Sequence, residues 1–143
     1  MVVVIGFKKL SEEARIPTYG SNGAACMDLY VIEDYLLHPG EVRLLRTGLA
    51  FDIPRGYEIQ IRPRGSVIKS QLIILNSPGT VDEDYRGEVF VGVKNISDKD
   101  VAIKKDDRVA QMIIKEVIKM ELYEVDRLSE TSRGSGCLGS TGR

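Results

Sequence analysis

The stretch from Asn76 to Gly87 holds the residues whose types and spacing are best suited to chemistry. It places a carboxylate, Asp82, three residues before a tyrosine, Tyr85, ahead of an alternating run that begins at Val89. An aspartate that points into a pocket can orient and deprotonate a water molecule. A tyrosine ring offers a flat surface for a sugar, and the free backbone groups of a wide β-hairpin can pair with the edge of a nucleobase. The alternative interpretation is an ordinary hairpin with solvated acidic side chains.

Two further stretches suit a phosphate group. Arg62 to Ser66 combines two arginines, which offer bidentate forks, with a serine hydroxyl donor and a possible helix start. Residues 133–142 form a glycine-rich segment whose backbone N–H groups can wrap a polyphosphate, although its spacing is not that of a P-loop. Taken singly, the first stretch is explained as well by a strand-to-helix turn, and the second by a disordered end.

Other polar residues stand in apolar surroundings. Gln111 alternates with apolar neighbours, so its side chain can face a pocket. Asp107 and Arg108 are predicted to form a surface ion pair worth under about 1 kcal/mol. Asp28 follows small residues in a run typical of a packed strand, and a buried aspartate needs an arginine or hydroxyl partner.

Strands must position these residues, because the dominant apolar period is two. Turn signals such as Pro39-Gly40 and Pro54-Arg55-Gly56 separate the runs and favour a sandwich or barrel. One helical turn is predicted at Ser11–Ala14 and a short helix at Ser66–Leu72, capped by Ser66. The strands are predicted at Met1–Ile5, Val42–Leu45, Leu49–Ile53, Tyr57–Ile61, Val89–Val93, Val101–Ile103 and Val109–Ile118.

Composition narrows the function classes. A length of 143 residues favours one domain, and 43% hydrophobic with 29% charged residues is typical of a globular protein. The formal net charge of -1 gives no general attraction to nucleic acid or membrane, so positive charge for phosphates must be local. Two cysteines without a CxxC pair favour a cytoplasmic setting. A single histidine, His38, excludes a histidine-rich zinc site and makes a Ser-His-Asp triad hard to build.

Five segments, in this order along the chain, resemble the five motifs of the trimeric dUTPases. Thr47–Ala50 is also similar to the family's sequence between the first two motifs, so the resemblance spans nearly the whole chain. One such motif is modest support, whereas five in order are specific. The five segments are Ala24–Tyr30, Pro63–Ser66, Asn76–Gly87, Asp107–Met112 and Arg133–Gly142.

The resemblance implies an all-β, jelly-roll-like distorted β-barrel with at most one short helix and a flexible glycine-rich tail. It divides the chain into a core, residues 1–128, and a mobile lid, residues 129–143. It implies a homotrimer with shared active sites that hydrolyses dUTP to dUMP and pyrophosphate, which limits uracil incorporation into DNA and supplies dUMP for thymidylate synthesis. Mg²⁺ is the implied cofactor, held mainly by substrate phosphates and waters rather than by protein residues.

The resemblance also implies roles for individual residues. Asp82 is the general base that activates a water for attack on the α-phosphate, and Tyr85 packs under the deoxyribose and excludes a 2′-hydroxyl. Asp28, Asp107 and Arg108 are structural residues behind the site. The remaining substrate-binding residues are Arg64, Gly65, Ser66, Asn76, Gly79, Thr80, Val81, Phe90, Gln111, Arg133, Leu138, Gly139 and Ser140.

The chain departs from the family pattern at four positions. Gly65 stands where the family usually has serine, so the hydroxyl expected after Arg64 is either missing or moved by one residue to Ser66. Leu138 stands where a phenylalanine usually stacks on uracil, which reduces a stacking contribution of about 1–3 kcal/mol. Cys26 and Cys137 replace glycines. These departures leave room for a nucleotide-sensing interaction protein on the same fold. A dCTP deaminase and a β-rich structural domain are further alternatives.

Overall fold

The computed structural model describes residues 1–142 as twelve β-strands and one short helix. The element bounds are β1 Gly6–Lys9, β2 Thr18–Tyr19, β3 Met27–Leu29, β4 Tyr35–Leu37, β5 Val42–Arg46, β6 Leu49–Asp52, β7 Tyr57–Pro63, α1 Val67–Ser70, β8 Leu72–Ile74, β9 Gly79–Val81, β10 Phe90–Asn95, β11 Val101–Ile103 and β12 Ala110–Glu116.

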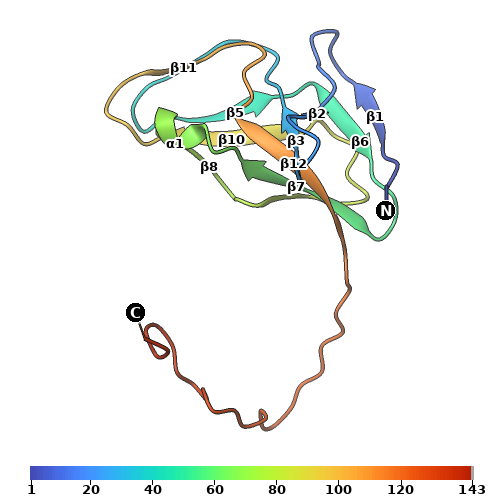
Figure 1. The fold of residues 1–143 in the computed structure, drawn as a ribbon, viewed down its shortest axis with the longest axis vertical. Helices are drawn as coiled ribbons and strands as arrows, with labels where there is room; N and C mark the ends of the chain where they lie inside the picture. The colour runs from blue at the N-terminus through green and yellow to red at the C-terminus, as the bar shows by residue number, and fades with distance from the viewer. Residues whose placement is uncertain (143) are drawn as a thin grey trace.

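The strands form antiparallel sheets whose order differs from the chain order (Figure 1). The largest sheet has the order β2-β3-β12-β7-β9, and β5-β10-β8, β1-β6 and β11-β4 form smaller sheets. The longest pairing joins β12 to β7, from Ala110 opposite Pro63 to Glu116 opposite Tyr57. The arrangement confirms the predicted all-β, jelly-roll-like fold with one short helix.

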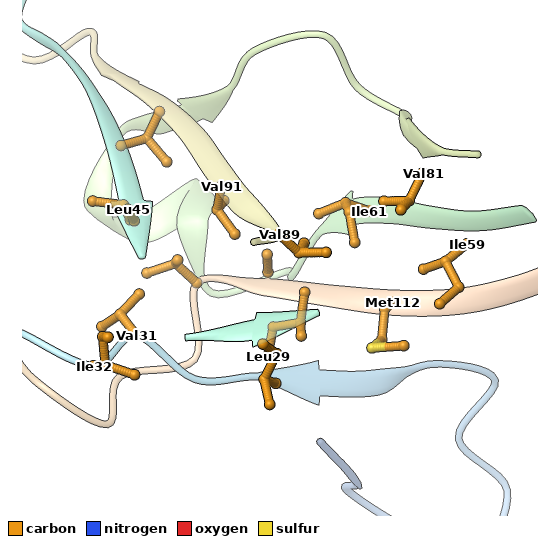
Figure 2. Close-up of a cluster of buried hydrophobic side chains, with 14 of the residues drawn as sticks. Leu29, Val31, Ile32, Leu45, Ile59, Ile61, Val81, Val89, Val91 and Met112 are labelled. Atoms are coloured by element: carbon orange, nitrogen blue, oxygen red, sulfur yellow. The ribbon is translucent and has the colours of Figure 1, made fainter. Parts of the chain in front are cut away.

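A cluster of buried hydrophobic side chains, most of them aliphatic, lies between the sheets (Figure 2). Ile59 and Ile61 of β7 point into it because alternate residues of a strand face the same side, and they are 0% and 5% exposed. Val91 and Val93 of β10 enter it from the facing sheet and are also buried. Each such side chain contributes about 1.5–3 kcal/mol through burial. The period-two pattern therefore identified the core strands correctly.

Three local predictions are wrong or incomplete. The first strand is Gly6–Lys9 rather than Met1–Ile5, because the pairing partner β6 lies opposite Gly6 to Lys9. Ser11–Ala14 forms one hydrogen-bonded turn and no helix. The helix after Arg64 is present as α1, but the Ser66 side chain makes no capping hydrogen bond.

The segment after β12 extends away from the body of the protein (Figure 1). Residues 118–142 are all exposed, including the apolar side chains of Ile118, Met120 and Leu122. These three alternate as in a strand, and no strand is formed by this segment. No helix within residues 1–142 is long and apolar enough to span a membrane.

Candidate active site

A hollow of about 220 Å³ lies between β9 and the start of β10. The predicted wide hairpin is not a paired hairpin: β9 pairs with β7, and β10 pairs with β5 and β8. The two arms therefore open into different sheets. β9 is an edge strand, and Phe90 and Val91 pair with β5 only, so both arms keep free backbone groups on the sides that border the hollow. Its volume is below the ~300–1,000 Å³ of pockets for whole small molecules, so it suits one part of a ligand.

Seven of the predicted substrate residues line this hollow together. Asp82 and Tyr85 lie in the loop that follows β9, and both are exposed. The seven residues are Asn76, Gly79, Thr80, Val81, Asp82, Tyr85 and Phe90.

Neighbouring turns hold the loop that carries Asp82 and Tyr85. The Glu83 carboxylate accepts the N–H of Gly56 at 2.5 Å, and Arg86 forms an ion pair with Asp52 at 2.9 Å. Because the loop is held at these two points, the Asp82 carboxylate and the Tyr85 ring keep a constant relative position.

A second hollow collects the predicted phosphate ligands around a buried carboxylate. Asp28 is 5% exposed, forms an ion pair with Arg64 Nε at 2.7 Å, and accepts a hydrogen bond from Arg108 Nη1 at 3.1 Å. Asp28 is therefore buried, and of the two expected partner types, arginine or hydroxyl, the structure provides arginine. The predicted Asp107–Arg108 ion pair is wrong: Asp107 instead accepts the N–H of Lys104, because the Asp28 carboxylate offers Arg108 a buried partner.

The other phosphate candidates border the same hollow. Gly65 and Ser66 follow Arg64 and are exposed. Gln111 donates from its side-chain amide to the Pro63 carbonyl at 2.8 Å, which holds the turn against β12. Two arginines around one aspartate leave net positive charge here, which fits an anion.

The two hollows lie on opposite sides of the five-stranded sheet. Ile61 borders the first hollow and pairs with Met112, whereas Gln111, the next residue along β12, borders the second. Successive residues of a strand point to opposite faces. The lining residues of the two hollows do not overlap.

The predicted ligands in the tail lie apart from both hollows. The residues there are exposed, and Leu138 is 99% exposed. The structure thus groups the hairpin residues and the phosphate residues, but does not bring the tail to either group. The tail residues concerned are Arg133, Leu138, Gly139 and Ser140.

Within residues 1–142, no three His, Cys, Asp or Glu side chains are grouped so that they could hold a metal ion. The carboxylate nearest the phosphate candidates, Asp28, is already paired with two arginines. The donor set available here therefore fits a metal that brings its own oxygen ligands, from phosphates and waters.

Comparison with known proteins decides the family. The dUTPase family model matches residues 12–142. The chain belongs to the dUTPase family. It is 51% identical over 137 residues to the deoxyuridine 5'-triphosphate nucleotidohydrolase of Nautilia profundicola, covering 95% of this chain and 96% of that protein. It is 49% identical over 137 residues to the protein of the same name from Hydrogenobaculum sp., covering 94% and 95%.

Solved structures of dUTPases share the fold. The Staphylococcus bacteriophage 80alpha dUTPase with dUPNHPP is 26% identical, with a TM-score of 0.90, covering 99% of this chain and 100% of that one. The dUTPase of the S. aureus phage phi11, solved in a study of a structural Mg(II) ion, is 23% identical with a TM-score of 0.81, covering 90% and 100%.

Sequence reasoning missed Glu88 in this dUTPase-family site. Its place just before the alternating run that begins at Val89 predicts an outward-facing side chain, but that side chain is only 12% exposed and borders the first hollow. The sequence feature that could have indicated a contact in the interior is the charged side chain of Glu88 directly before the apolar Val89. Cys26, Ser21 and Gly20 of the second hollow were likewise not assigned to phosphate binding.

Proposed function

We propose that this chain hydrolyses dUTP to dUMP and pyrophosphate, which removes dUTP from the DNA precursors and supplies dUMP for thymidylate synthesis. Family membership gives the reaction, and one observation carries its assignment to residues. Asp82 and Tyr85 border the same hollow as the free backbone edges of β9 and β10. One hollow can therefore bind the base and the sugar and position the attacking water.

The hollow between β9 and β10 takes the uracil and the deoxyribose. Backbone N–H and C=O groups between Gly79 and Phe90 pair with the edge of uracil, and Asn76 orients this region. The approach of the two arms excludes a 5-methyl group. Tyr85 lies under the deoxyribose, where a 2′-hydroxyl would meet the ring and lose its hydration without a new partner.

Asp82 is the general base. A carboxylate with no hydrogen bond to its side chain among the described residues is free to accept a proton from water. The activated water attacks the α-phosphorus, the bond to the bridging oxygen breaks, and pyrophosphate leaves. Phosphoryl transfer of this kind depends mainly on positioning and charge neutralisation, which arginines supply well.

The second hollow holds the phosphates. Arg64 and Gln111 are held in place by Asp28 and Pro63, and Ser66 adds a hydroxyl donor. Mg²⁺, bound by phosphate oxygens and waters, would neutralise charge on the triphosphate.

A complete site needs more than one copy of the chain. The two hollows face opposite sides of a sheet, and the tail touches neither, which supports sites shared between copies of the chain. The resemblance to the trimeric dUTPases makes a homotrimer the assembly that we propose. The exposed alternating side chains of Ile118, Met120 and Leu122 suit packing on a neighbouring subunit. Residues 129–142 then close over the nucleotide as a lid, with Arg133 on the phosphates and Leu138, Gly139 and Ser140 over the base and sugar; residue 143 of the predicted lid lies outside the described residues.

Pyrophosphate release from dUTP, dTTP, dCTP and UTP with Mg²⁺ tests the proposal. We expect strong preference for dUTP, and at least a ~1,000-fold loss for Asp82→Asn, because the general base is removed. Asp84→Asn is the matched control, since Asp84 is an exposed acid of the same loop that does not border the hollow. Equal turnover of the four nucleotides, or equal effects of the two variants, contradicts the proposal.

The other functions are outcomes of the same assay. Ammonia release from dCTP would indicate a deaminase. Tight dUTP binding with negligible pyrophosphate release would indicate a nucleotide-sensing protein.

A further inference from the structure

Glu88 is a carboxylate of the first hollow that has no role in the reaction proposed above. Its side chain contacts the turn between β5 and β6: Gly48 N–H donates to Oε1 at 2.8 Å, and Arg46 donates from Nε to Oε1 at 3.2 Å and from Nη2 to Oε2 at 3.3 Å. Charge-assisted bonds from a backbone amide and a guanidinium fix the orientation of a carboxylate. The carboxylate is therefore occupied by these contacts rather than free for a ligand.

The backbone of Glu88 holds the Tyr85 ring, which is proposed to lie under the sugar, through a hydrogen bond. The Tyr85 hydroxyl donates to the Glu88 carbonyl oxygen at 2.8 Å. The next residue, Val89, is fixed by the same turn: its N–H donates to the Leu49 carbonyl at 2.8 Å, and its carbonyl accepts from Thr47 Oγ1 at 2.5 Å. The carbonyl that receives the Tyr85 hydroxyl is thus placed by side-chain and backbone contacts from β5–β6.

The Tyr85 ring follows this backbone closely. A Cβ added at Gly87 would overlap the hydroxyl and ring atoms of Tyr85. The ring therefore lies directly against the chain between Tyr85 and Glu88, so a shift of that chain must move the ring. In an ordinary flexible loop, a side chain 43% exposed would have several orientations.

We propose that Glu88 is a positioning residue that sets the preference for deoxyribose over ribose by holding the Tyr85 ring through the Glu88 carbonyl. The inference rests on the proposed function, because it assigns the specificity of that same site. A 2′-hydroxyl is excluded only if the Tyr85 ring cannot move away from it, because a displacement of under an ångström relieves the steric conflict. Glu88 supplies that rigidity without touching the nucleotide.

The ratio of kcat/KM for UTP to that for dUTP is the decisive readout. A variant that merely lowers the fraction of folded enzyme reduces both values equally and leaves the ratio unchanged. We expect Glu88→Ala to raise the ratio about tenfold, the change that corresponds to loss of about one hydrogen bond. Glu88→Gln keeps an oxygen acceptor for the Gly48 N–H, so we expect it to stay within about threefold of the wild type.

A double-mutant cycle separates this route from a general loosening of the loop. Tyr85→Phe removes the hydroxyl that rests on the Glu88 carbonyl, so Glu88→Ala should add little to the ratio in that background. Glu41→Ala is the matched control, because the Glu41 carboxylate also accepts a backbone N–H, from His38 at 2.8 Å, and pairs with an arginine, Arg43, but makes no hydrogen bond to Glu88 or Tyr85. If Glu88→Ala does not fold, Arg46→Met takes its place, because it removes the guanidinium that donates to the Glu88 carboxylate. It should raise the ratio of kcat/KM for UTP to that for dUTP about threefold.

The outcomes are distinct. A wild-type protein that does not prefer dUTP overturns the proposed function and this inference with it. A wild-type protein that prefers dUTP, with a ratio unchanged in Glu88→Ala or in Arg46→Met, overturns the inference alone. Additive effects of Glu88→Ala and Tyr85→Phe, or an equal effect of Glu41→Ala, also overturn it.

Discussion

Replacing Asp28 with asparagine tests whether a buried charge organises the phosphate side of the site. Asparagine keeps one acceptor oxygen, but its NH₂ group faces a guanidinium where the second carboxylate oxygen stood. The change therefore removes one charge-assisted hydrogen bond and leaves two arginines around a neutral group. The side chains of Arg64 and Arg108 are 26% and 45% exposed, so water recovers part of their hydration.

The expected cost follows from these exposures. A hydrogen bond to a charged group contributes about 1.5–3 kcal/mol, and partial access to water brings the expected loss of unfolding free energy to about 2 kcal/mol. For a domain of this size, that corresponds to a fall in Tm of about 6 °C. We also expect kcat/KM for dUTP to fall about tenfold, since Arg64 loses its fixed orientation.

Thermal unfolding and pyrophosphate release measure both effects at one protein concentration, because association makes Tm depend on concentration. Asp52→Asn is the control: Asp52 also pairs with an arginine, Arg86, at 2.9 Å, but these side chains are 76% and 55% exposed. Such a pair is worth about 0–1 kcal/mol, so its Tm should change by less than about 3 °C. Equal shifts in the two variants would refute the reasoning from burial.

Leu138→Phe should lower the KM for dUTP about fivefold in steady-state assays, because an aromatic ring adds about 1 kcal/mol of stacking on the base. Removal of residues 129–143 should lower kcat/KM at least ~100-fold while Tm changes by under ~2 °C, because residues 129–142 are all exposed. Asn95→Ala should lower Tm by about 10 °C, since this fully buried amide makes four hydrogen bonds, which circular dichroism melting would check. The hydrogen bond to Asp100 raises the pKa of His38, so the protonated form favours the folded state at low pH and that contribution is lost as pH rises through the folded-state pKa. Asp100→Asn should lower the His38 pKa toward its ordinary value, followed by NMR on the chain's single histidine.

The sequence predicted what local periodicity controls. The alternation at Tyr57–Ile61 located a core strand, and the cost of burying Asp28 without a partner predicted an arginine or hydroxyl contact, of which arginine is found. Pairing between distant segments was not predictable in this way. Nothing local to Asn76–Phe90 indicates that its first arm joins β7 and its second joins β5 and β8.

Glu88 shows a second limit of the period-two argument. Alternation separates one face of a strand from the other, but it cannot tell solvent from a polar interior contact. The donors that bury the carboxylate, Arg46 and Gly48, lie about 40 residues earlier in the chain. Gly65 and Leu138 were recognised as departures from the family pattern, and their effects stay predictions.

The placement of the two hollows on opposite sides of one sheet has a consequence for mixtures of chains. In the proposed trimer, each chain contributes the hollow for uracil and deoxyribose to one active site. It contributes its phosphate-binding residues and its tail to other active sites. A protomer below the concentration of association would be inactive, so the activity would rise more steeply than in proportion to the amount of protein. A single defective chain would impair more than one site, and a population with some defective chains would lose more activity than its composition suggests.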